Sequence, residues 1–435
     1  MSDVPMTRPQ EVLAEHMMPS GHSTSWVDLG AGQILMSAGR NFYRSEDGGL
    51  TWSQPFAGRN EDGSNLSASC ACMVRLNDGA LGLAHIERNS DRHGDTSMVF
   101  KRSTDGGETW SKPVRMNRHL PAAALQDVFL RTSSGRLILP VYISLGQGTP
   151  RAENAPFVGG YHQGQFVSTD AHYVDPHFSV SYCLLSDDDG KTWGAAEGEL
   201  HIKTAYNGQY EYANEPSVAE VAPGKLIIVV RNRLGRLFQA WSEDDGTTWS
   251  RLQPTALASS TAPAQIRSIP ANGHLLIVWN QETETEIQRG LIRMRVSSAI
   301  SRNGGGAWEF LQNVESLLEG THVFPGPIRP TLPAQVFDDA GKSAHEIDPQ
   351  YLARQPSAHL PERMGRMSYP SVLVCDDRVL VIQTFQRYDQ RDKYPPGGSR
   401  LKVLPLSWFY GGADPLSEQM RTNPTLEKVW RAAHP

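Results

Sequence analysis

The octapeptide SEDGGLTW, Ser45–Trp52, is the first of four near-identical copies along the chain. The others are STDGGETW at 103–110, SDDDGKTW at 186–193 and SEDDGTTW at 242–249, and SRNGGGAW at 301–308 is a degraded fifth copy. Successive copies begin 58, 83, 56 and 59 residues apart, which indicates a repeated supersecondary unit with one longer insertion. Asp and Gly favour a tight turn, and the final Trp begins the next strand and packs inward. Each copy therefore predicts a structural turn between two strands.

The segments between the octapeptides alternate well, as in GKLIIVVRNRLGRLFQAWS before the fourth copy. Units of about four strands at this spacing are typical of propeller blades. Residues 320–410 contain no octapeptide, but SYPSVLVCDDRVLVIQTF within them predicts another strand pair. We therefore predict an all-β fold, a single six-bladed β-propeller of four-stranded antiparallel blades over residues 25–420.

The two ends of the chain are expected to lie outside these blades, except for a closing strand. We predict that a strand near residues 25–37 pairs with the last blade and closes the ring. Residues 1–24 would form an arm or a short helix. Residues 421–435 would form a tail or a short helix near 426–433.

Composition excludes several classes of partner. The chain has 435 residues, with 41 Lys+Arg against 47 Asp+Glu and a formal charge of −6, so it is not basic enough to bind a phosphate backbone. Neither a signal-peptide pattern nor a membrane-length apolar run is present in the sequence. We expect a cytoplasmic protein without nucleic-acid or membrane partners. We also expect no cofactor and no metal, and buried free thiols at the four cysteines.

The octapeptide resembles the Asp-box, or BNR repeat, of the sialidase (neuraminidase) superfamily. Asp-boxes occur in propellers of many functions, so the resemblance implies a fold before it implies an activity. In sialidases the site lies on the propeller axis. Three Arg hold the substrate carboxylate, a Tyr with a Glu partner is the nucleophile, and an Asp is the acid/base.

NEPSVAEVAPGKLIIVVR, at 214–231, resembles the sialidase segment that carries the Glu partner and the second clamp Arg. The resemblance implies these roles for Glu215 and Arg231. Arg231 also ends an apolar strand, where a charged group needs a partner or a ligand. The alternative is a salt bridge between the two residues at a strand end.

RMSYPSVL, at 366–373, resembles the late sialidase segment in which Tyr opens a strand of the last blade, and implies that Tyr369 is the nucleophile. A phenol has a reference pKa near 10, so it needs a carboxylate base within hydrogen-bonding distance. Glu215 would be that base. Alternatively, Tyr369 is an interfacial core aromatic.

The other clamp residues match the family pattern less completely. In GLIRMRVSSAIS, Arg293 is favoured as the third Arg, and Arg295, two residues on, is expected on the same face. One of the two is expected to face the axis and the other to lie deeper or outward. The first clamp motif is missing, because SNLSASCACMVRLNDG at 64–79 has neither Arg nor Pro around Ser69. Either Arg88 or Arg40 substitutes for it, or the substrate is not an ordinary sialic acid.

The acid/base is expected in the loop IERNSDRHGDTSMV, at 86–99, where Asp95 and Asp91 are candidates and His93 is a third. A solvated polar loop is the alternative. Asp127 opens the following blade and is expected either to reach the axis and bind substrate or to start a surface strand. The long insertion at 145–176 suits a loop over the site or a subunit contact in a homo-oligomer.

These features predict an exo-acting, retaining glycoside hydrolase of the sialidase type that releases a terminal acidic sugar. Its partner would be a carbohydrate with a carboxylate. One alternative is a lyase that acts next to a uronic acid. Another is a glycan-binding propeller without activity.

Overall fold

The computed structural model describes most of the chain. The described residues are 11–19, 24–89, 96–118, 121–147, 159–162, 165–168, 175–203, 210–211, 213–232, 234–288, 291, 293–326, 328, 364–394 and 397–421. The described helices are all short, and none of them has the apolar length needed to span a bilayer.

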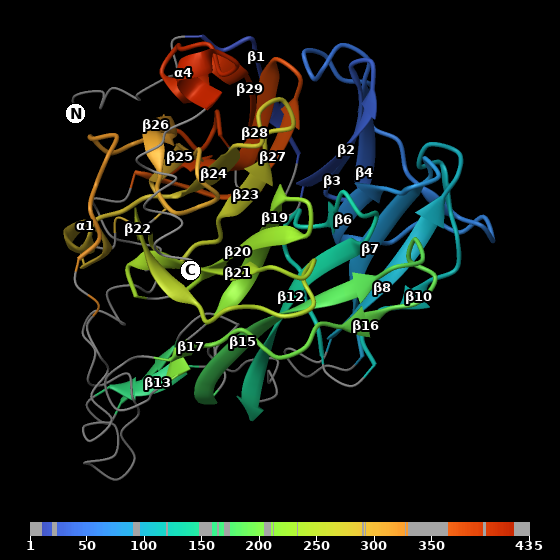
Figure 1. The fold of residues 1–435 in the computed structure, drawn as a ribbon, viewed down its shortest axis with the longest axis horizontal. Coiled ribbons are helices and arrows are strands. Elements are labelled where there is room, and N and C mark those ends of the chain that lie inside the picture. Colours follow the sequence, from blue (N-terminus) through green and yellow to red (C-terminus); the bar gives the residue numbers. More distant parts are fainter. Residues whose placement is uncertain are drawn as a thin grey trace.

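Six antiparallel sheets are arranged around a common axis, which confirms the predicted propeller (Figure 1). The blades, each from its axial strand outward, are β2 (Thr24–Gly30), β3 (Gln33–Ala38) and β4 (Asn41–Ser45); β6 (Ser69–Arg75), β7 (Leu81–Arg88), β8 (Thr96–Ser103) and β10 (Val114–Arg115); β11 (Leu130–Arg131), β12 (Leu137–Gln147), β15 (Asp175–Ser186) and β16 (Gly194–Ala195); β19 (Asn214–Ala222), β20 (Lys225–Arg231), β21 (Arg236–Ser242) and β22 (Gln253–Ala258); β23 (Gln265–Ser268), β24 (Leu275–Asn280), β25 (Arg295–Ser301) and β26 (Glu309–Ser316); and β27 (Gly365–Cys375), β28 (Arg378–Arg387), β29 (Ser399–Pro405) and β1 (Ala14–Met18).

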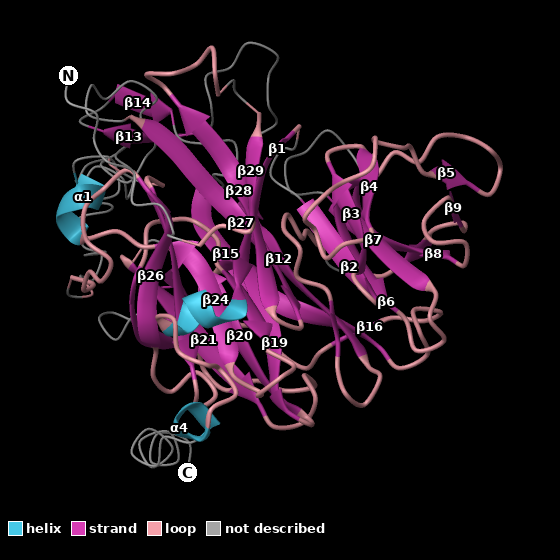
Figure 2. Cartoon of the chain, turned by 90° about the horizontal axis from the view of Figure 1, so that it is seen from above, coloured by secondary structure: helices cyan, strands magenta, loops and turns pink. Residues whose placement is uncertain are grey.

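Short strand pairs and short helices lie outside the six blades; Figure 2 colours strands magenta and helices cyan. They are the pairs β5 (Arg59–Asn60) with β9 (Thr109–Trp110), β13 (Gly159–His162) with β14 (Gln165–Ser168) and β17 (Ile202–Lys203) with β18 (Tyr210–Glu211), and the helices α1 (Glu284–Gln288), η2 (Leu406–Tyr410) and α4 (Glu418–Arg421). The expected helix near 426–433 lies outside the described residues.

The ring closes through β1, which pairs antiparallel with β29 from Ala14↔Val403 to Met18↔Ser399. The prediction that residues 25–37 close the ring was wrong, because they form the two inner strands of the first blade. The closing strand, AEHMM, is difficult to recognise in the sequence. It is an edge strand of five residues, and Met18 is its one buried side chain.

Each octapeptide forms a turn held by its own side chains. In the first copy, Ser45 Oγ accepts a hydrogen bond from the Gly49 N–H at 2.8 Å and donates one to Asp47 Oδ1 at 2.8 Å. Asp47 accepts two more from Thr51, from the N–H at 2.9 Å and from the hydroxyl at 2.6 Å. The copies at 103–110, 186–193 and 242–249 repeat this pattern.

The turns also join neighbouring blades through glycine. Gly107 has φ +93°, and a Cβ added there would lie 2.9 Å from Leu35 Cδ2 of the preceding blade. Gly246 has φ +83°, and its Cβ would lie 2.9 Å from Ile138 Cδ1. At both positions Gly is required by the backbone conformation and by the close approach of the neighbouring blade. The apolar clusters accordingly lie between adjacent blades.

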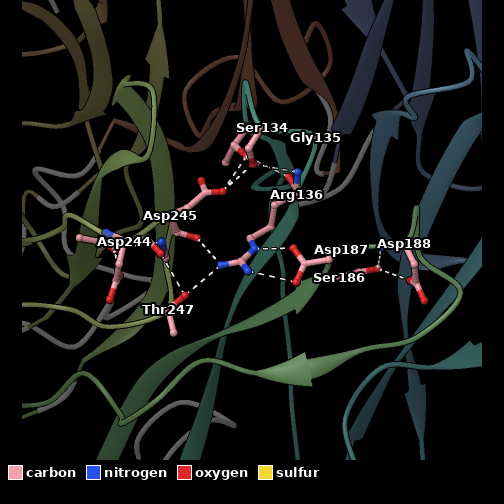
Figure 3. Close-up of polar contacts among 12 residues, drawn as sticks. Ser134, Gly135, Arg136, Ser186, Asp187, Asp188, Asp244, Asp245 and Thr247 are labelled. Atoms are coloured by element: carbon pink, nitrogen blue, oxygen red, sulfur yellow. Dashed lines mark hydrogen bonds and ion pairs between the residues drawn. The ribbon is translucent and has the colours of Figure 1, made fainter.

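Polar contacts add to this packing between the third and fourth copies (Figure 3). Arg136, in the turn before β12, makes a bidentate pair with Asp187 at 2.6 and 3.0 Å. Its NH1 also donates to the Asp245 carbonyl at 3.0 Å and to Thr247 Oγ1 at 2.9 Å. One guanidinium therefore bridges two octapeptide turns.

Candidate active site

Two of the expected site residues lie at matching β-bulges on axial strands. In β19 the pairing with β20 shifts between Asn214 and Ser217, so Glu215 and Pro216 occupy the extra position. In β27 the same shift occurs between Ser368 and Ser371, around Tyr369-Pro370. Proline lacks an N–H and is tolerated at bulges, so the Glu-Pro and Tyr-Pro dipeptides suit this geometry.

The backbone at the site is strained. Seven non-glycine residues in the described part of the chain have positive φ, and three of them are Glu215 at +40°, Arg293 at +61° and Tyr369 at +56°. Such conformations cost about 1–3 kcal/mol each and persist only where the surrounding structure imposes them. Their concentration at one place makes it the candidate functional site.

The bulges bring Tyr369, Glu215 and Arg231 into one chain of hydrogen bonds. Tyr369 Oη donates to Glu215 Oε1 at 2.8 Å, and Arg231 NH1 donates to Glu215 Oε2 at 2.6 Å. Their exposed fractions are 8%, 3% and 5%. Burial and the adjacent Glu215 carboxylate raise the pKa of Tyr369 to about 12, against the opposing effect of Arg231 and Arg293. The phenol is therefore protonated at neutral pH and points its proton at a carboxylate oxygen. The alternative salt bridge between Glu215 and Arg231 is present as part of this chain.

Arg293 completes the cluster from the fifth blade. Its NH2 donates to the Thr261 carbonyl at 3.0 Å, its NH1 lies 3.5 Å from Ser368 Oγ, and its guanidinium carbon is 5.6 Å from the centre of the Tyr369 ring. Burial lowers the pKa of Arg293 to about 10, and the charges of Arg366 and Arg231 act in the same direction. Positive charges therefore gather here, as they would for an anionic ligand.

Arg295 does not share this position. It is fully buried and donates to both oxygens of Glu286 in α1, at 3.1 and 2.9 Å. One of the two arginines thus lies deeper, as expected. The expectation that they share a face was wrong, because Arg293 precedes β25 in a left-handed turn and strand alternation does not apply to it.

Arg366 is a site residue that the sequence analysis missed. It lies three residues before Tyr369 on β27, is half-buried, and is near enough to Arg293 to lower the pKa of that residue. The Met367 N–H also donates to the Arg293 carbonyl at 2.6 Å, which holds this part of β27 against the Arg293 turn. The signal was available, because Arg366 belongs to the segment that carries Tyr369.

Asp127 reaches the axial strands, where it contacts residues of β2, β23 and β27. Its Oδ1 accepts from Ser25 at 2.6 Å and its Oδ2 from Arg267 at 2.9 Å, and Ser371, two residues beyond Tyr369, lies 3.5 Å away. The side chain is 3% exposed, and burial raises its pKa despite Arg267. Asp127 thus helps to plug the axis by linking the first, third, fifth and sixth blades, and its expected role in substrate binding stays a prediction.

A cavity of about 250 Å³ lies next to Asp127. Its walls include Asp28, Arg75, Arg131, Arg267 and Leu373. Asp127 also lines it, whereas Tyr369, Glu215, Arg231 and Arg293 are not among its lining residues.

The other residues expected at the site are either exposed away from the cluster or outside the described residues. Arg88 and Arg40 are exposed, at the end of β7 and before β4. Asp91, His93 and Asp95 lie outside the described residues. Among the described residues, no group of three His, Cys, Asp or Glu side chains is arranged to hold a metal.

The cluster can polarise a phenol and hold an anion beside it. It offers a Tyr hydroxyl with a carboxylate acceptor, Arg231 and Arg293 beside them, and Arg366 near Arg293. A neutral phenol avoids the repulsion that a carboxylate nucleophile would have with an anionic ligand.

Comparison with known proteins agrees with this fold. The model of the BNR repeat-like domain matches residues 41–382. A sialidase of Bacteroides fragilis is 28% identical over 225 residues, which cover 50% of this chain and only 34% of that protein.

Among solved structures, a protein of unknown function from Dyadobacter fermentans has a TM-score of 0.52 at 15% identity and covers 92% of this chain and 99% of its own. A Hadza microbial sialidase has a TM-score of 0.53 at 15% identity, with 89% and 67% covered. At these identities the structures show the fold alone. The match over residues 41–382 shows that the chain belongs to the BNR repeat-like family.

Proposed function

We propose that the protein is an exo-acting, retaining glycoside hydrolase that removes a terminal sugar acid of the sialic acid type. The observation that carries this proposal is the hydrogen bond from Tyr369 Oη to Glu215 Oε1 at 2.8 Å, in a cluster that also contains Arg231 and Arg293. The sialidase relative supports the same class of reaction.

In the first step, Tyr369 Oη bonds to the anomeric carbon while the glycosidic C–O bond breaks. The phenol proton passes to Glu215 Oε1, along the existing hydrogen bond. Because the pKa of Tyr369 is raised to about 12, almost all of the phenol is protonated at neutral pH before the attack. Proton transfer must therefore accompany attack, and the Glu215 carboxylate must be ionised when the step begins.

The leaving oxygen needs a proton, and the resulting aryl glycoside must then be hydrolysed. Asp91 and Asp95 remain the candidates for the acid, which would later take a proton from the attacking water. Water adds to the anomeric carbon, the bond to Tyr369 Oη breaks, and Glu215 returns the proton to the phenolate. Two inversions give net retention.

The arginines would bind the sugar carboxylate. Arg231 binds Glu215, Arg293 lies beside the Tyr369 ring, and Arg366 acts electrostatically on Arg293, so we assign the ligand carboxylate to Arg293 and Arg366. Arg366 would supply the charge that the missing first clamp motif does not. Each charge-assisted hydrogen bond contributes about 1.5–3 kcal/mol.

Product analysis tests the proposal. The protein should release free N-acetylneuraminic acid from a synthetic α-sialoside, with the α anomer formed first by NMR. An unsaturated, ultraviolet-absorbing product from a uronic acid substrate would instead indicate a lyase. Binding of either sugar acid without product would indicate a glycan-binding propeller.

A further inference from the structure

Glu282 is a buried carboxyl that the proposed chemistry does not use. It lies two residues after β24, at the start of the loop that leads through α1 to Arg293, and its exposed fraction is 0%. Its Oε1 accepts hydrogen bonds from the backbone N–H of Arg293 at 2.5 Å and of Met294 at 3.2 Å. One side-chain oxygen therefore ties the two ends of this loop together.

The tie falls at the strained turn. Arg293 has φ +61°, which an L-residue adopts only when its surroundings hold it there. Two backbone hydrogen bonds to one carboxylate supply part of that restraint. This backbone conformation directs the Arg293 guanidinium toward Thr261 and Ser368, beside the Tyr369 ring.

The surroundings of Glu282 make its ionisation costly. Burial raises the pKa of Glu282 to about 7, and the Glu286 carboxylate adds to this effect. The Ser260 hydroxyl, the Arg293 N–H and the Arg295 guanidinium act in the opposite direction. The carboxyl thus changes charge near neutral pH, and an ionised acceptor binds N–H groups more strongly than a neutral one.

We propose that Glu282 is a positioning residue, whose carboxylate fixes the left-handed turn that presents Arg293 to the anionic group of the ligand. The inference rests on the proposed function only for the nature of that ligand. It follows that the Arg293 turn is held most firmly above about pH 7, where Glu282 is ionised. Binding of a sugar acid then weakens as the pH falls through this range.

Two measurements on the full chain test the proposal. Hydrogen exchange of the Arg293 and Met294 amides, corrected for intrinsic rates between pH 5.5 and 8.5, needs no ligand. Calorimetric titration with N-acetylneuraminic acid over the same range reports binding. The variants are Glu282→Ala and Glu282→Gln, and Glu286→Gln is the matched control because it removes a neighbouring carboxylate.

Glu282→Ala should speed the hydrogen exchange of both amides. It should also lower the affinity for N-acetylneuraminic acid about tenfold, the size expected for lost hydrogen bonds to a charged acceptor. Glu282→Gln keeps an oxygen acceptor, so it should retain most protection but lose the change near pH 7. Glu286→Gln should keep that change and move its midpoint to lower pH, because the Glu286 charge raises the pKa of Glu282.

The two proposals fail separately. If N-acetylneuraminic acid does not bind the unmodified protein, the function is wrong and amide exchange alone decides the role of Glu282. If it binds but Glu282→Ala leaves affinity and exchange unchanged, the positioning role is wrong. Should the Ala variant not fold, a Gln variant with an unaltered pH profile would overturn the proposal by itself.

Discussion

Tyr369 Oη lies 2.8 Å from Glu215 Oε1, although the two residues are 154 positions apart in the chain. Each has positive φ, each precedes a proline, and each sits at a bulge of an axial strand, on the sixth and the fourth blade. The same distortion is thus used twice to aim a side chain at the axis. A core aromatic would not need this geometry, which favours the catalytic interpretation of Tyr369.

Removing the phenol hydroxyl should abolish turnover and spare binding. Tyr369→Phe is expected to lose most of kcat while its affinity for N-acetylneuraminic acid stays within a few-fold, because the hydroxyl acts in the transition state. In the protein without this substitution, a fluorinated mechanism-based sialic acid should leave a covalent adduct on the peptide that contains Tyr369, detected by mass spectrometry. Glu215→Gln should impair the same step.

Tyr182→Phe is the matched control, since it removes another buried phenol hydroxyl, bonded to the Pro121 carbonyl at 3.0 Å in the third blade. It should keep full turnover and form the adduct. An enzyme that is inactivated by the fluorinated sugar without any label on Tyr369 would contradict the mechanism.

Substitutions of Arg231, Arg293 and Arg366 should differ in their effects on KM and kcat. Replacing Arg293 or Arg366 by Met is expected to raise KM for an acidic substrate by roughly tenfold or more, the value of one charge-assisted hydrogen bond. Arg231→Met should also lower kcat, because Arg231 holds Glu215 at 2.6 Å. A substrate amide should bind the unmodified protein poorly. Equal affinity for acid and amide would show that the cluster does not bind a carboxylate.

The sequence predicted the fold from local signals and the site only in part. Each octapeptide forms its turn through hydrogen bonds among its own residues, so the turn can be recognised from the sequence alone. Glu215 and Tyr369 were found through the short segments around them. Arg366 and Glu282 were missed because their importance depends on where the Arg293 turn lies against β27 and β24. The closing strand was missed because four of its five side chains are not buried.

The octapeptide tryptophans should differ in their effect on stability. Trp110 is fully buried, its Nε1 donates to the Gly107 carbonyl at 3.0 Å, and it packs on Phe42 at 5.9 Å between ring centres. Trp110→Ala should lower the free energy of unfolding by about 3–5 kcal/mol. Trp308 is only half-buried, and its turn lacks the threonine hydroxyl because Ala307 stands there. Trp308→Ala should lower the free energy of unfolding clearly less, with both variants measured by urea titration. Equal losses of unfolding free energy would contradict the account of the turns.

A buried ion cluster should hold the fifth and sixth blades together. Glu315 of β26 is 0% exposed, and its Oε2 lies 2.6 Å from Lys402 Nζ and 3.0 Å from Arg400 NH1, both on β29. Glu315→Ala would remove the buried carboxylate from both cations and leave Arg400 with the partly exposed Glu15 at 3.6 Å, so we expect a loss of about 3–5 kcal/mol in the free energy of unfolding. Glu243→Ala is the control, because its pair with Lys225 is exposed on both sides and such pairs contribute about 0–1 kcal/mol. Replacing Glu315, Arg400 and Lys402 together by Met should restore much of the loss, since removing all charges removes the desolvation cost. If the single and triple variants unfold at the same urea concentration, the damage comes from packing and not from unpaired charge.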